Sequence, residues 1–170
     1  LYTYGFVVNP NEDDSLEIDA NFEQSLAVSP QLLDFIKGHD LMKYWSIDSA
    51  GEVSHNLVAA FQIVYLSKSL GGVCPPPQNL VQKIMWGEGA SEKVETAAKQ
   101  AILKMLTSCK ETFGQDVVEV KNAGALRTAS DLGVWLHAEG LSGPQIDMLL
   151  MREGELDILN RCISNLESTL

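Results

Sequence analysis

The sequence lacks the features of several common protein classes. It has only three cysteines, Cys74, Cys109 and Cys162, and no CxxC pair. An odd, widely spaced set excludes a disulfide framework and a cysteine-based zinc site, and it favours a reducing, intracellular compartment. No run of about 18 apolar residues occurs, so no membrane span is indicated. The hydrophobic share of 45% is too high for a disordered chain, so we expect a soluble globular protein.

Positive charge is also scarce. Twelve lysines and arginines stand against 23 aspartates and glutamates, which gives a formal net charge of −11. Such a chain is repelled by nucleic-acid phosphate and by anionic lipid, so we expect neither partner. An acidic surface suits a basic partner, such as a lysine-rich segment of another protein, but it is also a common means of remaining soluble.

The motifs of the common enzyme classes are missing as well. There is no Gly-rich phosphate loop, no GxSxG, no HExxH and no carboxylate–histidine cluster with metal-ligand spacing. His39, His55 and His137 stand in three separate segments beside polar or loop-forming neighbours, which favours surface or capping roles over catalysis. We therefore expect no metal site.

The first 28 residues have the composition of β structure. Aromatic and β-branched residues fill positions 2–8, a polar turn follows at Asn9-Pro10-Asn11, and residues 15–19 alternate between polar and apolar. We also expect an extended segment over 41–47 that ends in a turn at 48–51.

From Ser29 onward the hydrophobic period is helical. Ser29-Pro30 is an N-cap followed by proline at the first helical position, and Gly38 ends that helix. The pattern predicts further helices over 54–70, 79–86, 91–113, 131–138 and 143–168, with Gly71-Gly72 and Gly114 as stops. The predicted fold is mainly α: a multi-helical, bundle-like domain preceded by a short β segment.

Three of these helices carry apolar faces that predict the core. The helix over 54–70 has one stripe, made of Leu57, Val58, Phe61, Val64 and Tyr65. The helix over 91–113 has Val94, Ala97, Ala98, Ala101, Ile102, Met105, Leu106 and Cys109 on one face. The terminal helix turns Ile146, Leu149, Leu150, Leu156, Leu159, Ile163 and Leu166 inward, and Gly154 predicts a bend or a close contact within it. For Trp45, Trp86 and Trp135, packing in the core or between helices is the default.

Two motifs resemble a known family. The opening Leu1-Tyr2-Thr3-Tyr4-Gly5-Phe6-Val7, followed by Asn9-Pro10-Asn11-Glu12-Asp13-Asp14-Ser15-Leu16-Glu17-Ile18, resembles the end of the SET domain in the Rubisco-large-subunit-methyltransferase family. The stretch Leu149-Leu150-Met151-Arg152-Glu153-Gly154-Glu155-Leu156-Asp157-Ile158-Leu159 is similar to the final helix of that family, where an arginine precedes a Gly-Glu pair. The resemblance implies that residues 1–28 end a SET catalytic domain and that residues 29–170 form the helical substrate-binding domain.

The resemblance also implies an activity for the whole protein. It predicts methyl transfer from S-adenosylmethionine to a lysine side chain of a protein substrate, and Tyr4 matches the catalytic tyrosine of the family. A fixed phenol oxygen can orient the lysine amine and stabilise the polarised methyl group. Without the surrounding motif, Tyr4 would be interpreted as a half-buried strand aromatic.

The family pattern is incomplete in this sequence. The cofactor-binding part of a SET domain, including its Asn-His segment, would lie upstream of Leu1, so we expect a fragment that neither binds S-adenosylmethionine nor catalyses alone. No aromatic occurs between Val7 and Asn21, where some members place a second ring around the target lysine, and some relatives methylate histidine.

Two other functions stay open at this point. The chain could be a free-standing α-helical adaptor that binds a partner helix or peptide, or part of a catalytically dead SET scaffold. A Gly-rich cofactor strand and an Asn-His segment within about a hundred upstream residues would separate the enzyme from the adaptor. Members of the family occur in cytosol, nucleus and plastids, so the expected location is intracellular only.

Overall fold

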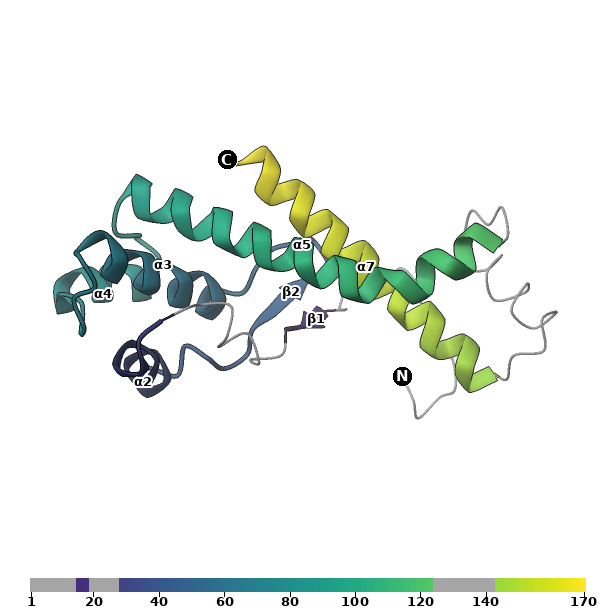
Figure 1. Cartoon of the computed structure of the whole chain (residues 1–170), viewed down its shortest axis with the longest axis horizontal. Helices are drawn as coiled ribbons and strands as arrows, with labels where there is room; N and C mark the ends of the chain where they lie inside the picture. Colours follow the sequence, from purple (N-terminus) through teal and green to yellow (C-terminus); the bar gives the residue numbers. More distant parts are fainter. Residues whose placement is uncertain (1–14, 19–27, 124–142) are drawn as a thin grey trace.

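The structure, a computed structural model, describes residues 15–18, 28–123 and 143–170. Within these ranges the chain is mainly helical, as predicted, with five helices and one two-stranded antiparallel sheet. The elements in chain order are β1 (Ser15–Glu17), α2 (Pro30–Gly38), β2 (Ser46–Asp48), α3 (His55–Ser69), α4 (Gln78–Met85), α5 (Glu92–Ala123) and α7 (Gly143–Ser168). The two longest helices, α5 and α7, cross each other, and α2, α3 and α4 gather at one end of α5 (Figure 1).

The predicted helix starts and stops are confirmed at most ends. The Ser29 hydroxyl accepts a hydrogen bond from the Leu32 amide at 3.3 Å and so caps α2. Ser91 does the same for α5 through the Val94 amide at 3.4 Å. At the end of α3, Gly71 has φ +79°, a left-handed conformation that most other residues avoid, so the helix stops there.

One predicted stop is wrong. We expected Gly114 to end the long helix, but α5 continues to Ala123. A glycine inside a helix costs only about 1 kcal/mol relative to alanine, which is too little to end a helix by itself. The helix predicted over 131–138 lies outside the described residues.

The small sheet joins the first described residues to the helical part. In β1 only Leu16 is buried, as its alternation predicts, and it lies opposite buried Ile47 of β2. The Ile18 amide extends the pairing by donating to the Trp45 carbonyl at 2.8 Å. The extended segment expected over 41–47 is shorter than predicted, because a turn occupies its first residues and the strand begins only at Ser46.

Helix α3 is buried around most of its circumference. The single stripe predicted for it is therefore wrong: Val58 and Tyr65 are only half-buried, whereas Ala59, Ala60 and Ile63 are fully buried. The reason is its position, because α3 packs against α2, α4 and α5 at once.

The predicted inner faces of the two long helices are confirmed in part. Val94, Ala98, Ile102, Met105 and Leu106 of α5 are buried, and so are Leu156, Leu159 and Ile163 of α7, whereas Ala97, Ala101 and Cys109 of α5 and Leu166 of α7 are only half-buried. Helix α7 also buries Ile158 and Cys162, which the predicted face did not include. The side chains of Ile146, Leu149 and Leu150 lie outside the described residues.

Helix α7 is attached to the turn that follows β2. The Arg161 guanidinium donates to the Ser49 carbonyl, and the Asn165 amide donates to the Ala50 carbonyl at 3.1 Å. Gly51, in the same turn, is buried with φ +82° and lies against the backbone of α7. No helix in the described ranges combines the length and the apolar character that a membrane span requires.

Candidate functional site: an open cleft between α2 and α4

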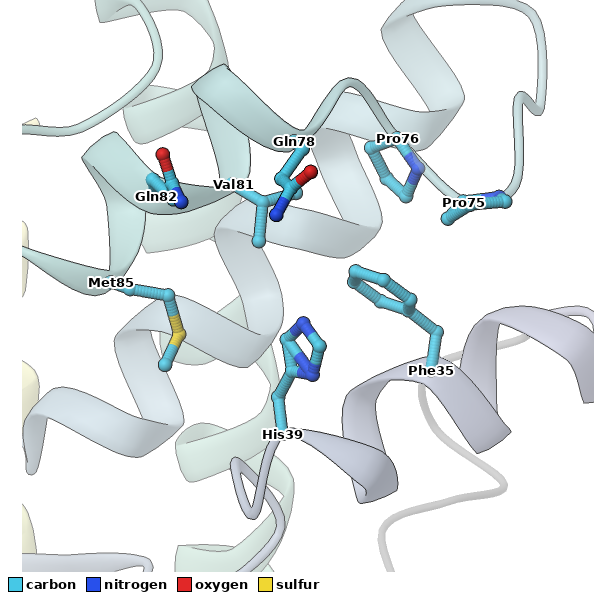
Figure 2. Close-up of a pocket in the computed structure, with 8 residues that line it drawn as sticks. All are labelled: Phe35, His39, Pro75, Pro76, Gln78, Val81, Gln82 and Met85. Atoms are coloured by element: carbon cyan, nitrogen blue, oxygen red, sulfur yellow. The ribbon is translucent and has the colours of Figure 1, made fainter.

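An open cleft lies between α2 and α4. Its volume is about 420 Å³, within the size range of ligand-binding pockets. It is lined by Phe35, His39, Pro75, Pro76, Gln78, Val81, Gln82 and Met85 (Figure 2). None of these eight residues is an aspartate, glutamate, lysine or arginine, so the lining is apolar, aromatic and amide in character.

The two walls of the cleft run in the same direction. Figure 2 shows Phe35 and His39 following one another on α2 toward the same end at which α4 reaches Met85. Pro75 and Pro76, which precede α4, lie at the opposite end, on the side of Phe35. The cleft is therefore bordered by a helix on each of two sides.

Each wall presents its side chains in pairs at a spacing of four residues. On α2, the rings of Phe35 and His39 are in contact, with centroids 4.4 Å apart and an interplanar angle of 47°. On α4, Gln78 and Gln82 are separated by one helical turn and both are exposed. Residues four apart lie on the same face of a helix, about 6 Å apart along its axis. One wall thus offers rings, and the other offers amides that can both donate and accept hydrogen bonds.

The side chains that line the cleft are suited to binding a ligand rather than to transferring a chemical group. It contains no serine, cysteine or carboxylate beside its histidine, so none of its side chains can serve as the nucleophile of a nucleophile–base pair. The cleft offers apolar contacts, and its two glutamine side chains offer amide hydrogen bonds like those of a peptide group.

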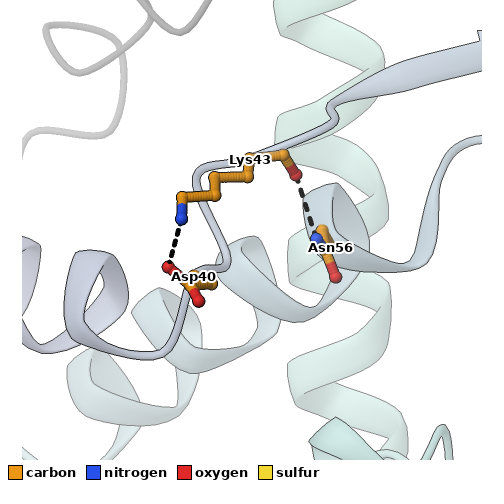
Figure 3. Close-up of polar contacts among 3 residues, drawn as sticks. All are labelled: Asp40, Lys43 and Asn56. Carbon is orange, nitrogen blue, oxygen red and sulfur yellow. Dashed lines mark hydrogen bonds and ion pairs between the residues drawn. The ribbon is translucent and has the colours of Figure 1, made fainter.

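The turn after α2 is held from two sides (Figure 3). The Lys43 ammonium lies 2.8 Å from the Asp40 carboxylate, and this hydrogen bond and charge raise the pKa of Lys43. The Lys43 carbonyl accepts a hydrogen bond from Asn56 of α3 at 2.9 Å. Asp40 and Tyr44 both have φ +58°, and the Tyr44 side chain is 85% exposed.

The tryptophans do not all follow the packing default. Trp45 does, since it is 2% exposed and its indole N–H donates to the Leu41 carbonyl at 2.5 Å. For Trp86 the default is wrong, because the residue caps the C-terminus of α4 and is 72% exposed. Trp86 directly follows Met85, the last residue of α4 that lines the cleft. Trp135 lies outside the described residues.

The two described histidines have the surface and capping roles that the sequence predicts. His39 is the C-cap of α2, and the His55 ring lies 3.1 Å from the Met85 carbonyl, so it links α3 to the end of α4. His137 lies outside the described residues. Across the described part of the chain, no three His, Cys, Asp or Glu residues cluster as a metal site would require.

The cysteines are free thiols, as expected from their spacing. Cys162 is a buried residue of α7, and its backbone lies next to Gly51 of the turn after β2. Burial, with a smaller contribution from the Asp48 charge, raises its pKa to about 11. Burial also raises the pKa of Cys109. Both thiols are therefore protonated near neutral pH, which makes them poor nucleophiles.

Tyr4, the residue that the family resemblance assigns to catalysis, lies outside the described residues together with its Tyr-Gly-Phe motif. The sequence reasoning in turn missed the cleft. Its signals were the four-residue spacing of Phe35 and His39 and that of Gln78 and Gln82, but no sequence pattern indicates that these two faces oppose each other.

Comparison of the chain with protein-family models, with curated proteins and with solved structures finds no match.

Proposed function

We propose that this chain is the substrate-binding C-terminal region of a SET-domain protein-lysine methyltransferase. In this proposal residues 1–28 end the catalytic domain, and residues 29–170 hold a protein substrate while S-adenosylmethionine, bound upstream, supplies the methyl group. Tyr4 would orient the lysine amine in the catalytic domain.

The observation that carries the holding role is the lining of the cleft between α2 and α4. It has apolar and amide groups suited to a polypeptide segment, and it lacks the groups needed for group transfer. The methyl-transfer part rests on a different observation, the Tyr4-Gly5-Phe6 triplet with the Asn9-Pro10-Asn11 turn after it.

Labelled methyl transfer by the full-length parent protein tests this function. Incubation with S-adenosylmethionine that carries a labelled methyl group, together with protein from the source cell, should label a lysine identified by mass spectrometry. The 170-residue chain alone should bind no S-adenosylmethionine in calorimetry, because the cofactor segment of a SET domain lies upstream. Micromolar binding by the chain alone would contradict the proposed domain organisation.

The second candidate is a free-standing helical adaptor, and the same cleft supports it. An adaptor needs a binding surface and no catalytic residues, which fits the chemistry of the described residues. Its parent gene would encode no Gly-rich cofactor strand and no Asn-His segment upstream of Leu1. A catalytically dead SET scaffold would encode both without transferring the methyl group.

A further inference from the structure

We propose that the cleft between α2 and α4 binds an extended, uncharged segment of a protein partner, flanked by basic residues. This inference rests on the proposed role of the chain as the holder of a protein segment, and it adds the conformation and the chemistry of that segment.

The spacing of the glutamines indicates an extended segment. Gln78 and Gln82 stand about 6 Å apart along α4. In a β-strand, backbone groups of residues i and i+2 point to the same side and repeat every 6.6–6.8 Å, roughly the same distance. Each glutamine amide can donate to the carbonyl and accept from the N–H of the residue opposite it. A helical segment could not pair in this way, because its backbone groups are already bonded internally.

The remaining lining residues suit the side chains of such a strand. The half-buried Phe35 and Met85 offer apolar contacts in the cleft, above the buried Val81, and thioether and aromatic groups adapt to side chains of different shape. Every second side chain of an extended segment would face this surface, because successive side chains alternate between the two faces of a strand.

Charge complementarity decides the chemistry of the partner. The lining contains no aspartate or glutamate, and its one basic side chain is His39, so a lysine or arginine side chain within the cleft would lose its hydration without gaining a carboxylate partner. Summed over the whole chain, the formal charge of −11 favours the approach of cations over anions, and this attraction extends over roughly a Debye length of 10 Å at 0.1 M salt. The segment that fits both conditions is apolar or weakly polar at its centre and basic at its ends.

A synthetic peptide tests this proposal without any methyl transfer. The probe has seven residues, alternating valine and threonine between two terminal lysines, and is added to the ¹⁵N-labelled 170-residue chain. We expect the side-chain amide signals of Gln78 and Gln82 to shift on titration. The double variant Gln78→Ala/Gln82→Ala should bind the peptide roughly tenfold more weakly or worse, since it loses two sets of hydrogen bonds.

Matched controls separate the cleft from the rest of the surface. Asn79→Ala removes an exposed amide from the same helix but outside the lining, and it should leave the affinity unchanged. A peptide methylated on alternate backbone nitrogens should bind weakly, and so should one with terminal glutamates in place of lysines. Circular dichroism should show all variants folded, because both glutamines are exposed.

Shifts confined to another face, an unchanged affinity of the double variant, or binding that tolerates backbone methylation would each overturn the inference. Glutamine shifts that appear on concentration of the chain alone would assign the cleft to a second copy and overturn it too. Methylation activity is not a readout here, so failure of the proposed enzyme function would leave this result intact. Conversely, an active methyltransferase whose cleft binds no peptide would refute the inference and the holding role assigned to the cleft, but not the proposed methyl transfer.

Discussion

Gly51 lies so close to Cys162 that a β-carbon on the glycine would sit 2.8 Å from the cysteine backbone nitrogen. The glycine also has φ +82°, so both its conformation and its surroundings require the absence of a side chain. The turn after β2 can approach α7 this closely only because residue 51 is glycine. This contact lets the Ser49 and Ala50 carbonyls accept hydrogen bonds from α7.

Gly51→Ala should therefore destabilise the chain more than the same change at an open glycine. Gly71 is the matched control, because it has φ +79° but no atom that would lie within 4 Å of an added β-carbon. We expect Gly71→Ala to cost about 1–2 kcal/mol of unfolding free energy, from backbone strain alone. Gly51→Ala should cost more, since the turn must also move away from α7. If urea denaturation gave the same loss of unfolding free energy for Gly51→Ala and Gly71→Ala, the close contact between Gly51 and α7 would contribute nothing to stability.

Neighbouring aromatic residues should differ sharply in their effect on stability. Trp45 is 2% exposed and packs in the core, so Trp45→Ala should lower the unfolding free energy by about 3–5 kcal/mol. Tyr44 is 85% exposed, so Tyr44→Ala should change it by no more than about 0.5 kcal/mol. Denaturant midpoints of the two variants provide the measurement. Losses of similar size for the two variants would contradict the burial difference between Trp45 and Tyr44.

Cys162 should make the chain less stable at high pH. Its pKa rises from about 9 in the unfolded chain to about 11 when buried, so the unfolded state loses the proton first. Ionisation of the thiol therefore does not affect stability well below pH 9 and lowers it progressively between pH 9 and 11. The loss of unfolding free energy between pH 8 and about 10.5 should be smaller for Cys162→Ala than for the unmodified chain. An identical pH dependence would show that the thiol does not titrate as its burial requires.

These contacts also show which parts of the fold the sequence could reveal. Local signals worked: Ser29-Pro30 and Ser91 begin helices, and Leu16 alternates with exposed neighbours, because each depends on residues a few positions away. The helix end predicted at Gly114 was wrong because a helix continues through one glycine when the flanking residues favour a helix.

Non-local packing could not be predicted from the sequence. The enclosure of α3 and the approach of Gly51 to α7 depend on segments far apart in the chain, and periodicity contains no information about which helices meet. The cleft is hidden for the same reason, since Phe35 and Gln82 lie 47 residues apart.

Association with a lysine-bearing partner should depend on salt if the acidic charge recruits it. The on-rate, measured by stopped flow with the full-length protein, should fall between about 20 and 300 mM salt, because screening shortens the Debye length across that range. The dissociation rate should change little, since long-range charge steers encounter more than it sets contact energy. An on-rate that does not change with salt concentration would indicate that apolar residues, such as the exposed Trp86, recognise the partner instead.

The turnover of a Tyr4→Phe variant tests the proposed methyltransferase most directly. In the full-length protein, single-turnover transfer of the methyl group from S-adenosylmethionine to the substrate lysine should slow by about 10²-fold or more, because one positioned oxygen is lost. Substrate affinity and the circular dichroism spectrum should stay the same, since phenylalanine keeps the ring. Tyr2→Phe, two residues earlier, is the control and should leave the rate unchanged. An undiminished rate for Tyr4→Phe would remove Tyr4 from the mechanism and contradict the proposed function at its centre.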